Sequence, residues 1–208
     1  MQTDTALPSA PAAERNFKPI LGVLQREFRS ANRVLEIGAG TGQHAVGFAR
    51  HMPWLRWQAT ERRDSLAPVN LWHEAAGAAN LEPPVALDVG VDEPPRTDFD
   101  AAFSANTAHI MAENVVLQMF ETVALALAGD GRFCLYGPFR ESGRFDTESN
   151  KRFDASLRSG SPEMGVRDIE KMDEFAARSG LARVRRFAMP GNNQILVYRA
   201  KDREHKLP

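Results

Sequence analysis

The sequence predicts an α/β fold, with a mainly parallel β-sheet, helices on both faces and an antiparallel β-hairpin at the C-terminal end. Short apolar runs of strand length alternate along the chain with segments of helical periodicity, and this alternation is typical of parallel strands joined by crossover helices. Near the end, residues 184–189 and 194–199 flank the turn-rich tetrapeptide Pro-Gly-Asn-Asn at 190–193. That arrangement predicts a hairpin.

The individual elements follow from the spacing of apolar residues. Strand candidates are short apolar runs bounded by turn or loop residues, and they cover residues 34–37, 55–60, 85–87, 99–104 and 132–136. Helix candidates repeat apolar residues every three or four positions, over residues 17–28, 45–50, 68–79 and 115–127. Residues 138–165 are polar and irregular in pattern. Loops of that length in compact domains are usually functional lids, with disorder as the alternative.

Length and composition indicate one ordinary globular domain. A chain of 208 residues with 43% hydrophobic and 25% charged residues buries a sizeable core without metals or crosslinks. We expect a single domain over residues 14–200, between a disordered tail over residues 1–13 and a charged tail over residues 201–208. The formal net charge of −1 gives no global reason to expect nucleic acid or an anionic membrane surface as a partner.

Cysteine usage and the N-terminal residues predict a cytoplasmic protein. Cys134 is the only cysteine, so no intramolecular disulfide forms, and its apolar neighbours suggest a buried thiol in a central strand. The first thirteen residues have neither a basic start nor an apolar segment, which argues against a secretory signal. The five histidines are scattered without zinc-ligand spacing, so no metal site is expected.

The most informative segment is residues 34–44, Val-Leu-Glu-Ile-Gly-Ala-Gly-Thr-Gly-Gln-His. It predicts a buried strand that breaks into a glycine turn and opens a helix, which is the arrangement of a nucleotide-cofactor loop. The dinucleotide fingerprint G-x-G-x-x-G requires its third glycine at position 43, where this chain has Gln43. Glu36 places a carboxylate before the loop, and a carboxylate favours a cationic ligand over a pyrophosphate.

Acidic and polar residues follow the next strand candidates in order. Glu61 ends the second strand, twenty-five residues beyond Glu36, where Rossmann-like folds place an acid that binds ribose hydroxyls. Asp88 and Val89 follow the third strand, and residues 105–109, Ala-Asn-Thr-Ala-His, follow the fourth. Each acid alone has a helix N-cap or a solvated loop as its simpler explanation. Together they predict one ligand site at the carboxyl ends of the strands.

The spacing G-x-G-x-G with Glu36 ahead of it resembles motif I of the class I methyltransferases that use S-adenosylmethionine. The resemblance implies a Rossmann-like, seven-stranded sheet and S-adenosylmethionine as the cofactor. In such proteins the acid after the third strand accepts the adenine amino group and the next backbone amide donates to the ring. The cofactor-binding residues that the resemblance implies are Glu36, Gly38, Ala39, Gly40, Gln43, His44, Glu61, Asp88, Val89 and Asn106.

A closer resemblance covers nearly the whole chain from Glu14 to Arg199. Gly-Thr-Gly-Gln-His at 40–44 and Tyr-Gly-Pro-Phe at 136–139, together with Glu-Arg-Asn at 14–16, are similar to a small group of bacterial and eukaryotic proteins that includes methyltransferase-like protein twenty-six. This group implies the fold and the methyl donor, and it implies nothing about the acceptor. Glu61 departs from the aspartate that related chains often carry, and the longer side chain should still reach a ribose.

Candidate residues for chemistry follow the strands that end near the expected cofactor. Loops at the carboxyl ends of strands face the ligand, so the candidate catalytic residues are Asn106, His109 and Tyr136. His109 is a candidate base if its pKa stays near neutrality, with capping of the following helix as the alternative. Candidate substrate-binding residues are Arg15, Asn16, Pro138, Phe139, Arg140, Asn192 and Asn193; an N-cap for Asn16 and turn formation for the two C-terminal asparagines are the simpler explanations.

Three functions are compatible with the sequence, and we rank them by how well the motifs fit. The leading hypothesis is an S-adenosylmethionine-dependent methyltransferase that acts on a small molecule, since no Asn-Pro-Pro-Tyr type motif for nucleic-acid bases follows Asn106. The second is a non-catalytic member that keeps the fold as a partner-binding module. The third is a nicotinamide oxidoreductase, which Gln43 disfavours.

Overall fold

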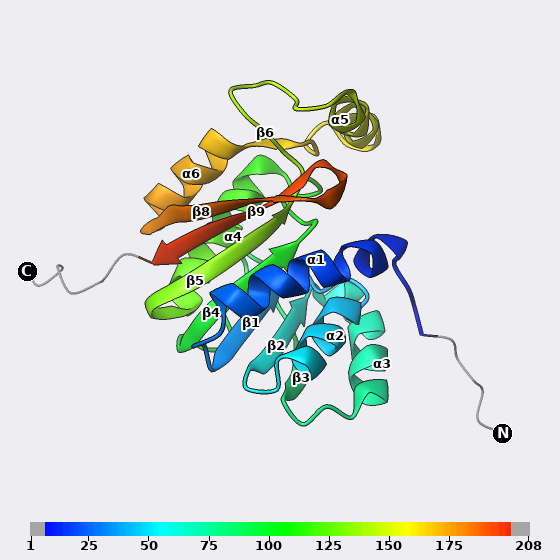
Figure 1. Ribbon diagram of the computed structural model, residues 1–208, viewed down its shortest axis with the longest axis vertical. Coiled ribbons are helices and arrows are strands. Elements are labelled where there is room, and N and C mark those ends of the chain that lie inside the picture. The colour runs from blue at the N-terminus through cyan, green and yellow to red at the C-terminus, as the bar shows by residue number, and fades with distance from the viewer. Residues whose placement is uncertain (1–6, 201–208) are drawn as a thin grey trace, which may run out of the picture.

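A computed structural model describes residues 7–200 and has the α/β architecture that the sequence predicts (Figure 1). Seven strands form one sheet in the order β3-β2-β1-β4-β5-β9-β8. The strands from β3 to β5 are parallel, and β9 is antiparallel to both β5 and β8. The bounds are β1 Arg33–Ile37, β2 Arg56–Glu61, β3 Leu81–Ala86, β4 Phe99–Ala105, β5 Leu127–Gly137, β8 Leu181–Met189 and β9 Asn193–Ala200.

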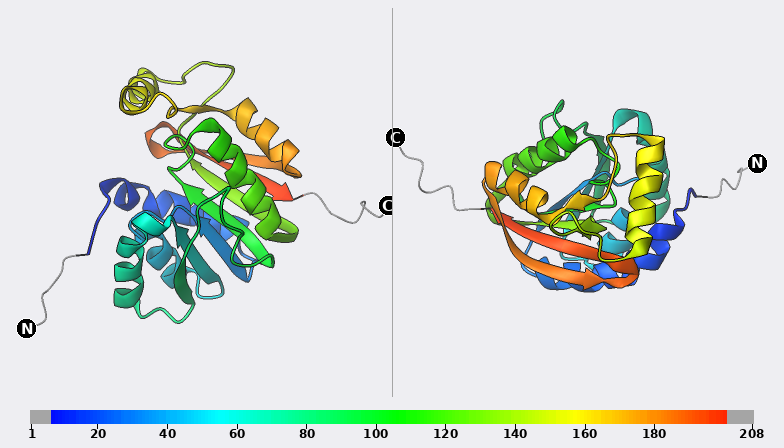
Figure 2. Two further views of the ribbon diagram at one scale, coloured as in Figure 1. Left: turned by 180° about the vertical axis from the view of Figure 1, so that it is seen from behind. Right: turned by 90° about the horizontal axis from the view of Figure 1, so that it is seen from above.

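Helices cover both faces of this sheet (Figure 2). On one face α1, α2 and α3 pack through an apolar cluster that includes Ile20, Phe48 and Val69. On the other face α4 and α6 pack through a second cluster that includes Phe120 and Phe175. The bounds are α1 Pro11–Glu27, α2 Gln43–His51, α3 Ala67–Ala76, α4 Glu113–Ala126 and α6 Ile169–Arg178, with a short 3-10 turn η1 at Arg63–Ser65. Because a sheet covered on both faces buries its strands, only its edges and strand ends are left for a ligand.

The edge of the sheet explains one local difference from the sequence prediction. Strand β3 begins at Leu81 rather than at residue 85 and contains Pro83 and Pro84, which an edge strand tolerates because it pairs on one side only. The expected hairpin is confirmed, with β8 and β9 joined by the 3-10 turn η2 at Pro190–Asn192. Cys134 is fully buried in the central strand β5, also as expected.

Helix α1 begins earlier than the sequence suggested. Its N-cap is Ala10, and Pro11 occupies the first turn, where its fixed φ and missing N–H suit a helix start. Asn16 is therefore inside the helix and is not an N-cap. It lies four residues before Ile20, so both side chains are on the buried face of α1. Residues 11–13 belong to the helix and not to a tail; residues 1–6 and 201–208 of the two expected tails lie outside the described residues.

Residues 138–165 are also more regular than expected. They contain a short strand β6 (Phe139–Arg140) and helix α5 (Glu148–Gly160), and β6 pairs in parallel with β7 (Arg167–Asp168). Thr147 caps α5 by accepting a hydrogen bond from the backbone N–H of Asn150 at 3.2 Å. We call residues 138–168 the cap, because α5 stands over the carboxyl end of the sheet in both orthogonal views (Figure 2).

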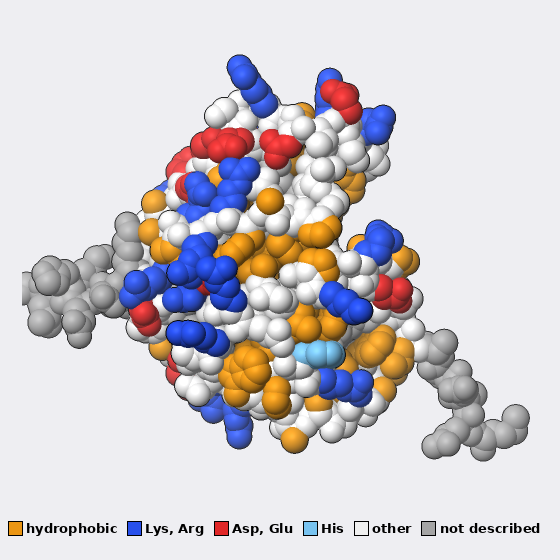
Figure 3. All heavy atoms as spheres, in the orientation of Figure 1, with side chains coloured by type: hydrophobic (Ala, Val, Ile, Leu, Met, Phe, Trp, Pro, Cys, Tyr) orange, Lys and Arg blue, Asp and Glu red, His pale blue; other side chains and the backbone are white. Residues whose placement is uncertain are grey.

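Basic side chains gather over the β8–β9 hairpin on one face of the molecule (Figure 3). Their cluster is ion-paired rather than simply solvated: Arg183 contacts Asp173 at 2.9 Å and Arg185 contacts Glu27 at 2.8 Å. The Glu27 side chain is fully buried, and it also binds Arg132 at 2.9 Å. A carboxylate from the last turn of α1 thus connects that helix to the sheet.

We expect Glu27→Gln to lower the free energy of unfolding by about 1–3 kcal/mol, because two guanidinium groups lose a buried charged partner. Urea denaturation at neutral pH measures the change. The matched control is Asp130→Asn, which removes an exposed ion pair with Arg199 and should change stability by less than about 0.5 kcal/mol. Equal effects in the two variants would contradict a structural role for Glu27.

Candidate active site

The carboxyl ends of β1 to β4 surround a cavity of about 700 Å³, which we call the strand-end cavity. It lies where open α/β sheets bind ligands, and its size is within the range of cofactor pockets. Its walls come from the start of α1, the glycine loop, the residues after β2, β3 and β4, and one residue of the cap. The lining residues are Ala10, Ala12, Ala13, Ile37, Gly38, Ala39, Gly40, Thr41, His44, Glu61, Arg62, Leu87, Asp88, Val89, Ala105, Asn106, Thr107, Ile110, Met111, Ala112, Val115 and Glu163.

Two glycines of the loop are required by close packing as well as by backbone conformation. Gly38 has φ 70°, and a Cβ there would lie 2.6 Å from Cγ2 of Thr107. Gly42 has φ 90°, and its Cβ would lie 3.1 Å from the Cα of Val69 in α3. The loop is therefore wedged between the segment after β4 and α3. This packing sets the shape of the cavity wall.

We expect Gly38→Ala to destabilise the protein by about 1–3 kcal/mol, because the residue must adopt a left-handed conformation and displace the Thr107 methyl group. Thermal or urea unfolding measures the change. Gly22→Ala is the matched control, because Gly22 lies in α1 with no atom within 4 Å of its notional Cβ. That control should gain roughly 0.5–1 kcal/mol. A neutral Gly38→Ala would contradict the packing argument.

Glu61 lines the strand-end cavity and fixes the glycine loop. Its Oε2 accepts a hydrogen bond from the backbone N–H of Gly40 at 2.7 Å, and its Oε1 accepts from the N–H of Arg62 at 2.9 Å. A carboxylate with further lone pairs can also accept from hydroxyl groups of a ligand. Glu61 therefore lies where the sequence predicts a ribose-binding acid.

Glu36 is placed differently from the expectation. It does not line the strand-end cavity; it is 2% exposed, and its Oε2 accepts a hydrogen bond from Nε1 of Trp57 at 2.7 Å. Burial raises the pKa of Glu36 to about 8; the Trp57 hydrogen bond opposes this rise and the charge of Glu61 adds to it. The side chain is thus mostly protonated and neutral at neutral pH. Glu36 therefore does not provide the negative charge that the sequence suggested for binding a cationic ligand.

Among the other predicted cofactor residues, only Gln43 is absent from the cavity wall. Gly38, Ala39, Gly40, His44, Asp88, Val89 and Asn106 all line it. The Gln43 amide oxygen instead accepts hydrogen bonds from the backbone N–H of Ala10 and the hydroxyl of Thr41. Gln43 therefore connects the start of α1 to the glycine loop.

Asn16 connects the strand-end cavity to a second cavity. Its Oδ1 lies 2.8 Å from Nε2 of His44, which donates because an amide oxygen only accepts. Burial lowers the pKa of His44 to about 4, so this ring is neutral at pH 7. Burial raises the pKa of Tyr136, and a hydrogen bond with the Asn16 side chain partly offsets that rise. His44, Asn16 and Tyr136 form one chain of polar contacts between α2, α1 and β5.

The second cavity, which we call the side cavity, has a volume of about 220 Å³. It shares Ala12 and Asn106 with the strand-end cavity. Asn106 has φ 60°, a conformation that asparagine tolerates, and its backbone N–H donates to the carbonyl of Tyr136 at 2.9 Å. Five residues predicted for catalysis or substrate binding come together here. The lining residues are Ala12, Arg15, Asn16, Pro19, Asn106, Tyr136, Pro190, Gly191 and Asn193.

The remaining predicted site residues lie elsewhere. His109 lines neither cavity: its ring packs edge-on against Phe153 of the cap at 5.2 Å, and burial together with the charge of Arg167 lowers its pKa to about 4. It does not cap α4 either, since Ala112 occupies that position. Phe139 is 1% exposed in the core under the cap. His109 and Phe139 therefore support the cap rather than contact a ligand in either cavity.

Pro138, Arg140 and Asn192 also lie outside both cavities. Pro138 is buried, and Arg140 forms an ion pair with Asp168 at 2.7 Å. The backbone carbonyl of Asn192 accepts a hydrogen bond from the Asn150 side chain at 3.0 Å, which connects the hairpin to the cap.

Several wall residues were missed by sequence reasoning. Ile110 and Met111 lie between β4 and α4, Val115 lies in the first turn of α4, and together they give the strand-end cavity an apolar side. Their position just after the Ala-Asn-Thr-Ala-His segment was the available signal. Glu163 comes from the cap, and its polar surroundings in the sequence carry no such signal.

Over residues 7–200, no group of three or more His, Cys, Asp or Glu side chains has a metal-binding arrangement, and no helix in that range is long and apolar enough to cross a membrane.

Solved structures of methyltransferases share this fold. The apo form of the S-adenosylmethionine-dependent methyltransferase SibL matches with a TM-score of 0.77 at 21% identity, over 91% of this chain and 55% of that chain. The SAH-bound form of CalO1, a methyltransferase in calicheamicin biosynthesis, matches with a TM-score of 0.75 at 17% identity, over 91% and 54%. An O-methyltransferase family 2 protein from Planctomyces limnophilus DSM 3776, in complex with apigenin, matches with a TM-score of 0.72 at 17% identity, over 81% and 51%.

This chain spans about half the length of those proteins. At such identities the likeness shows a shared class I methyltransferase fold. One protein family also matches residues 7–200, under the description "Protein of unknown function (DUF938)". Since the match covers nearly the whole chain, the protein belongs to the DUF938 family.

Proposed function

We propose that the protein is an S-adenosylmethionine-dependent methyltransferase that acts on a small polar molecule. The observation that carries the proposal is the meeting of two cavities at Asn106, one lined by the glycine loop, Glu61 and Asp88, the other by Tyr136. The first has the size and residue types for an adenosine-bearing donor, and the second opens beside it. The match of motifs to the methyltransferase-like protein twenty-six group supports the same reading.

The lining residues fit the donor part by part. Asp88 and the amide of Val89 would bind the adenine, Glu61 the ribose hydroxyls, and the loop from Gly38 to Gly40 would follow the methionine part toward Asn106. When bound, S-adenosylmethionine supplies an electrophilic methyl group on a sulfonium. Ile110, Met111 and Val115 give this cavity an apolar side against which the adenine ring could pack.

The chain's main task in such a reaction is orientation. Methyl transfer from a sulfonium is an in-line displacement. Most of the rate enhancement therefore comes from holding a nucleophile in the side cavity, in line with a methyl group near Asn106. Asn16 and Tyr136 offer hydrogen bonds, and the exposed Arg15 offers a positive charge at the same cavity. A volume of about 220 Å³ suits an acceptor smaller than a drug-sized ligand.

The polar chain between the cavities also restricts the acceptor. His44 is a weak base because its pKa is about 4, and Tyr136 is a neutral phenol because its pKa is raised. Neither group removes a proton efficiently near pH 7. We therefore propose an acceptor whose nucleophilic atom is already deprotonated at neutral pH without help from the protein, such as a carboxylate or a weakly basic amine.

Calorimetry with S-adenosylhomocysteine tests the donor site first. Heat of binding with a one-to-one stoichiometry is expected, and no heat at roughly millimolar protein would overturn the proposal, since it would place the dissociation constant above about 1 mM. Metabolite extracts incubated with a deuterated-methyl donor then identify the acceptor by mass spectrometry. Donor binding without a labelled product would favour a non-catalytic partner-binding protein. A change in NADH fluorescence on mixing would favour the oxidoreductase alternative.

A further inference from the structure

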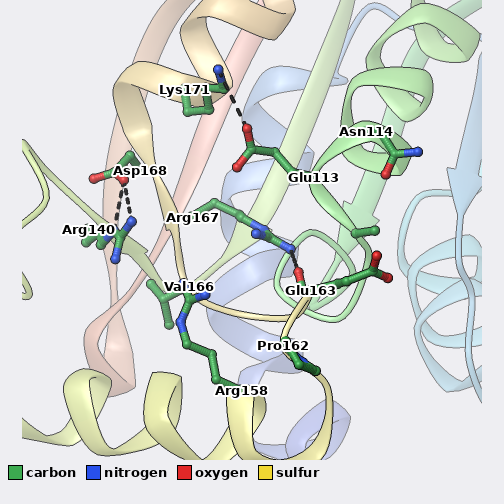
Figure 4. Close-up of a pocket in the computed structure, with 11 residues that line it drawn as sticks. Glu113, Asn114, Arg140, Arg158, Pro162, Glu163, Val166, Arg167, Asp168 and Lys171 are labelled. Carbon is green, nitrogen blue, oxygen red and sulfur yellow. Dashed lines mark hydrogen bonds and ion pairs between the residues drawn. The ribbon is translucent and has the colours of Figure 1, made fainter.

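A third cavity, which we call the cap cavity, lies between the cap, α6 and the start of α4, with a volume of about 470 Å³ (Figure 4). Four cationic side chains line it, and each comes from a different element: Arg140 from β6, Arg158 from α5, Arg167 from β7 and Lys171 from α6. Neither the methyl donor nor the side cavity uses any of these four residues. The cluster therefore needs an explanation of its own.

Arg167 differs from the other three cations because no carboxylate pairs with it in the described part of the chain. Arg140 pairs with Asp168, Arg158 with Asp154 and Lys171 with Glu113. The Arg167 guanidinium instead donates to the backbone carbonyls of Ala108 at 3.0 Å, Glu163 at 2.6 Å and Met111. Burial lowers the pKa of Arg167, and the positive charges of Arg158 and Arg140 lower it further, against the opposing effect of nearby carboxylates.

Three carboxylates also line the cavity, those of Glu113, Glu163 and Asp168, and they leave N–H groups of the three arginines free to bind a ligand. Asp168 accepts from Arg140 and also from the backbone N–H of Gly143 at 2.9 Å, so it holds the arginine from one side. Figure 4 shows Glu113 engaged with Lys171 and the Glu163 carboxylate turned away from the three guanidinium groups. Arginines held in this way present planar donor pairs that match carboxylate and phosphate oxygens.

Asp154 and the neighbouring Gly165 set the position of Arg158 at the cavity. A Cβ on Gly165, which has φ 153°, would lie 2.5 Å from Nη2 of Arg158. The Arg158 Nε also donates to Asp154 at 2.8 Å, and Asp154 accepts from the backbone N–H of Val166. The Asp154 contact therefore orients the Arg158 guanidinium at the cavity, while the side chain stays 42% exposed to solvent and to a ligand.

We propose that the cap cavity is a binding site for a small anion with phosphate or carboxylate groups, recognised by Arg140, Arg158 and Arg167. The anion supplies the negative charge that Arg167 lacks and relieves the repulsion among the three guanidinium groups. The cavity shares Ala112 and Glu163 with the strand-end cavity and no residue with the side cavity. Since the proposed function places the methyl acceptor in the side cavity, we assign the anion the role of an effector.

Arg167 also provides a physical connection from the cap cavity to the strand-end cavity. Two of its three carbonyl partners belong to Ala108 and Met111 in the segment after β4, and Met111 lines the strand-end cavity. An anion that fixes Arg167 therefore stabilises one arrangement of that wall. Any resulting change in donor affinity must be matched by an equal change in anion affinity.

The test uses the full chain without a donor, so that its outcome does not depend on the proposed methyltransferase activity. Calorimetry at constant ionic strength, adjusted with KCl to keep screening equal, measures binding of inorganic phosphate and, separately, of citrate. Whichever anion binds, Arg158→Gln and Arg140→Gln are each expected to lower its affinity by about tenfold or more, since charge-assisted hydrogen bonds are lost. Arg152→Gln is the matched control and should leave affinity unchanged, because Arg152 lies on the same helix α5 but does not line the cap cavity.

The two anions distinguish the class of ligand: phosphate binding alone indicates a phosphorylated effector, and citrate binding alone indicates a polycarboxylate. Equal affinities in Arg158→Gln and Arg152→Gln would overturn the proposal, as would no binding of either anion at roughly 10 mM. Competition between phosphate and S-adenosylhomocysteine for one site would also overturn it, because the anion would then lie in the strand-end cavity. Each variant is measured below its own unfolding temperature, so a stability loss is not read as lost binding.

Discussion

Replacing Glu61 with alanine is expected to weaken S-adenosylhomocysteine binding by roughly 10- to 100-fold, which corresponds to about 1.5–3 kcal/mol for a lost charge-assisted hydrogen bond. The carboxylate is expected to accept from the ribose hydroxyls while it also accepts from the N–H groups of Gly40 and Arg62. Both contacts disappear together in the alanine variant, so the ligand loses a partner and the loop loses an anchor. Titration calorimetry of the purified variant measures the change.

Two further variants separate these effects. Glu61→Gln keeps an acceptor oxygen for one backbone N–H and removes the charge, so its affinity should lie between that of the wild type and that of Glu61→Ala. Glu74→Ala is the control, because Glu74 is exposed in α3 and does not line the strand-end cavity. If Glu61→Ala bound the ligand as the wild type does, Glu61 would have no part in donor binding.

Replacing Glu36 with glutamine is expected to remove a strong pH dependence of stability. The pKa of Glu36 is about 8 in the folded protein, against an ordinary value of 4.5. Between those values the folded state keeps a proton that the unfolded state releases, so stability falls as pH rises. Each pH unit in this window costs about 1.4 kcal/mol, and the loss between pH 5 and pH 8 is about 3 kcal/mol.

Glutamine is neutral at every pH and still accepts the hydrogen bond of Trp57 through its amide oxygen. Urea denaturation at pH 5, 6.5 and 8 should therefore show Glu36→Gln gaining on the wild type as pH rises. Glu93→Gln, at an exposed position, should follow the wild-type profile. Parallel profiles for the wild type and Glu36→Gln would contradict the raised pKa.

The sheet was predictable because its strands are buried on both faces and therefore appear as short apolar runs. Glu61 and Asp88 could be placed for a related reason: Glu61 ends β2, Asp88 comes shortly after β3, and the carboxyl ends of parallel strands meet at one edge of the sheet. Strand β3 shows the limit of that rule. It includes two prolines at the sheet edge, where pairing on one side suffices.

Residues whose partners are distant in sequence could not be placed in this way. Asn16 resembles a helix cap by type, and only the start of α1 at Pro11 shows that it faces His44. Glu36 precedes the loop as a cofactor acid would, yet its side chain points to Trp57 on the neighbouring strand. Helix α5 was missed because its large apolar residues are few, Phe153 and Leu157 among thirteen positions.

The position of Ala10, Ala12 and Ala13 in the wall of the strand-end cavity affects how the protein should be produced. A recombinant chain truncated to start at Glu14, where the sequence places the domain boundary, would lack that part of the wall. It would also lose the hydrogen bonds that Gln43 and Trp72 make with the backbone of Ala10 and Pro8. Expression vectors and fusion tags should therefore preserve at least residues 7–13.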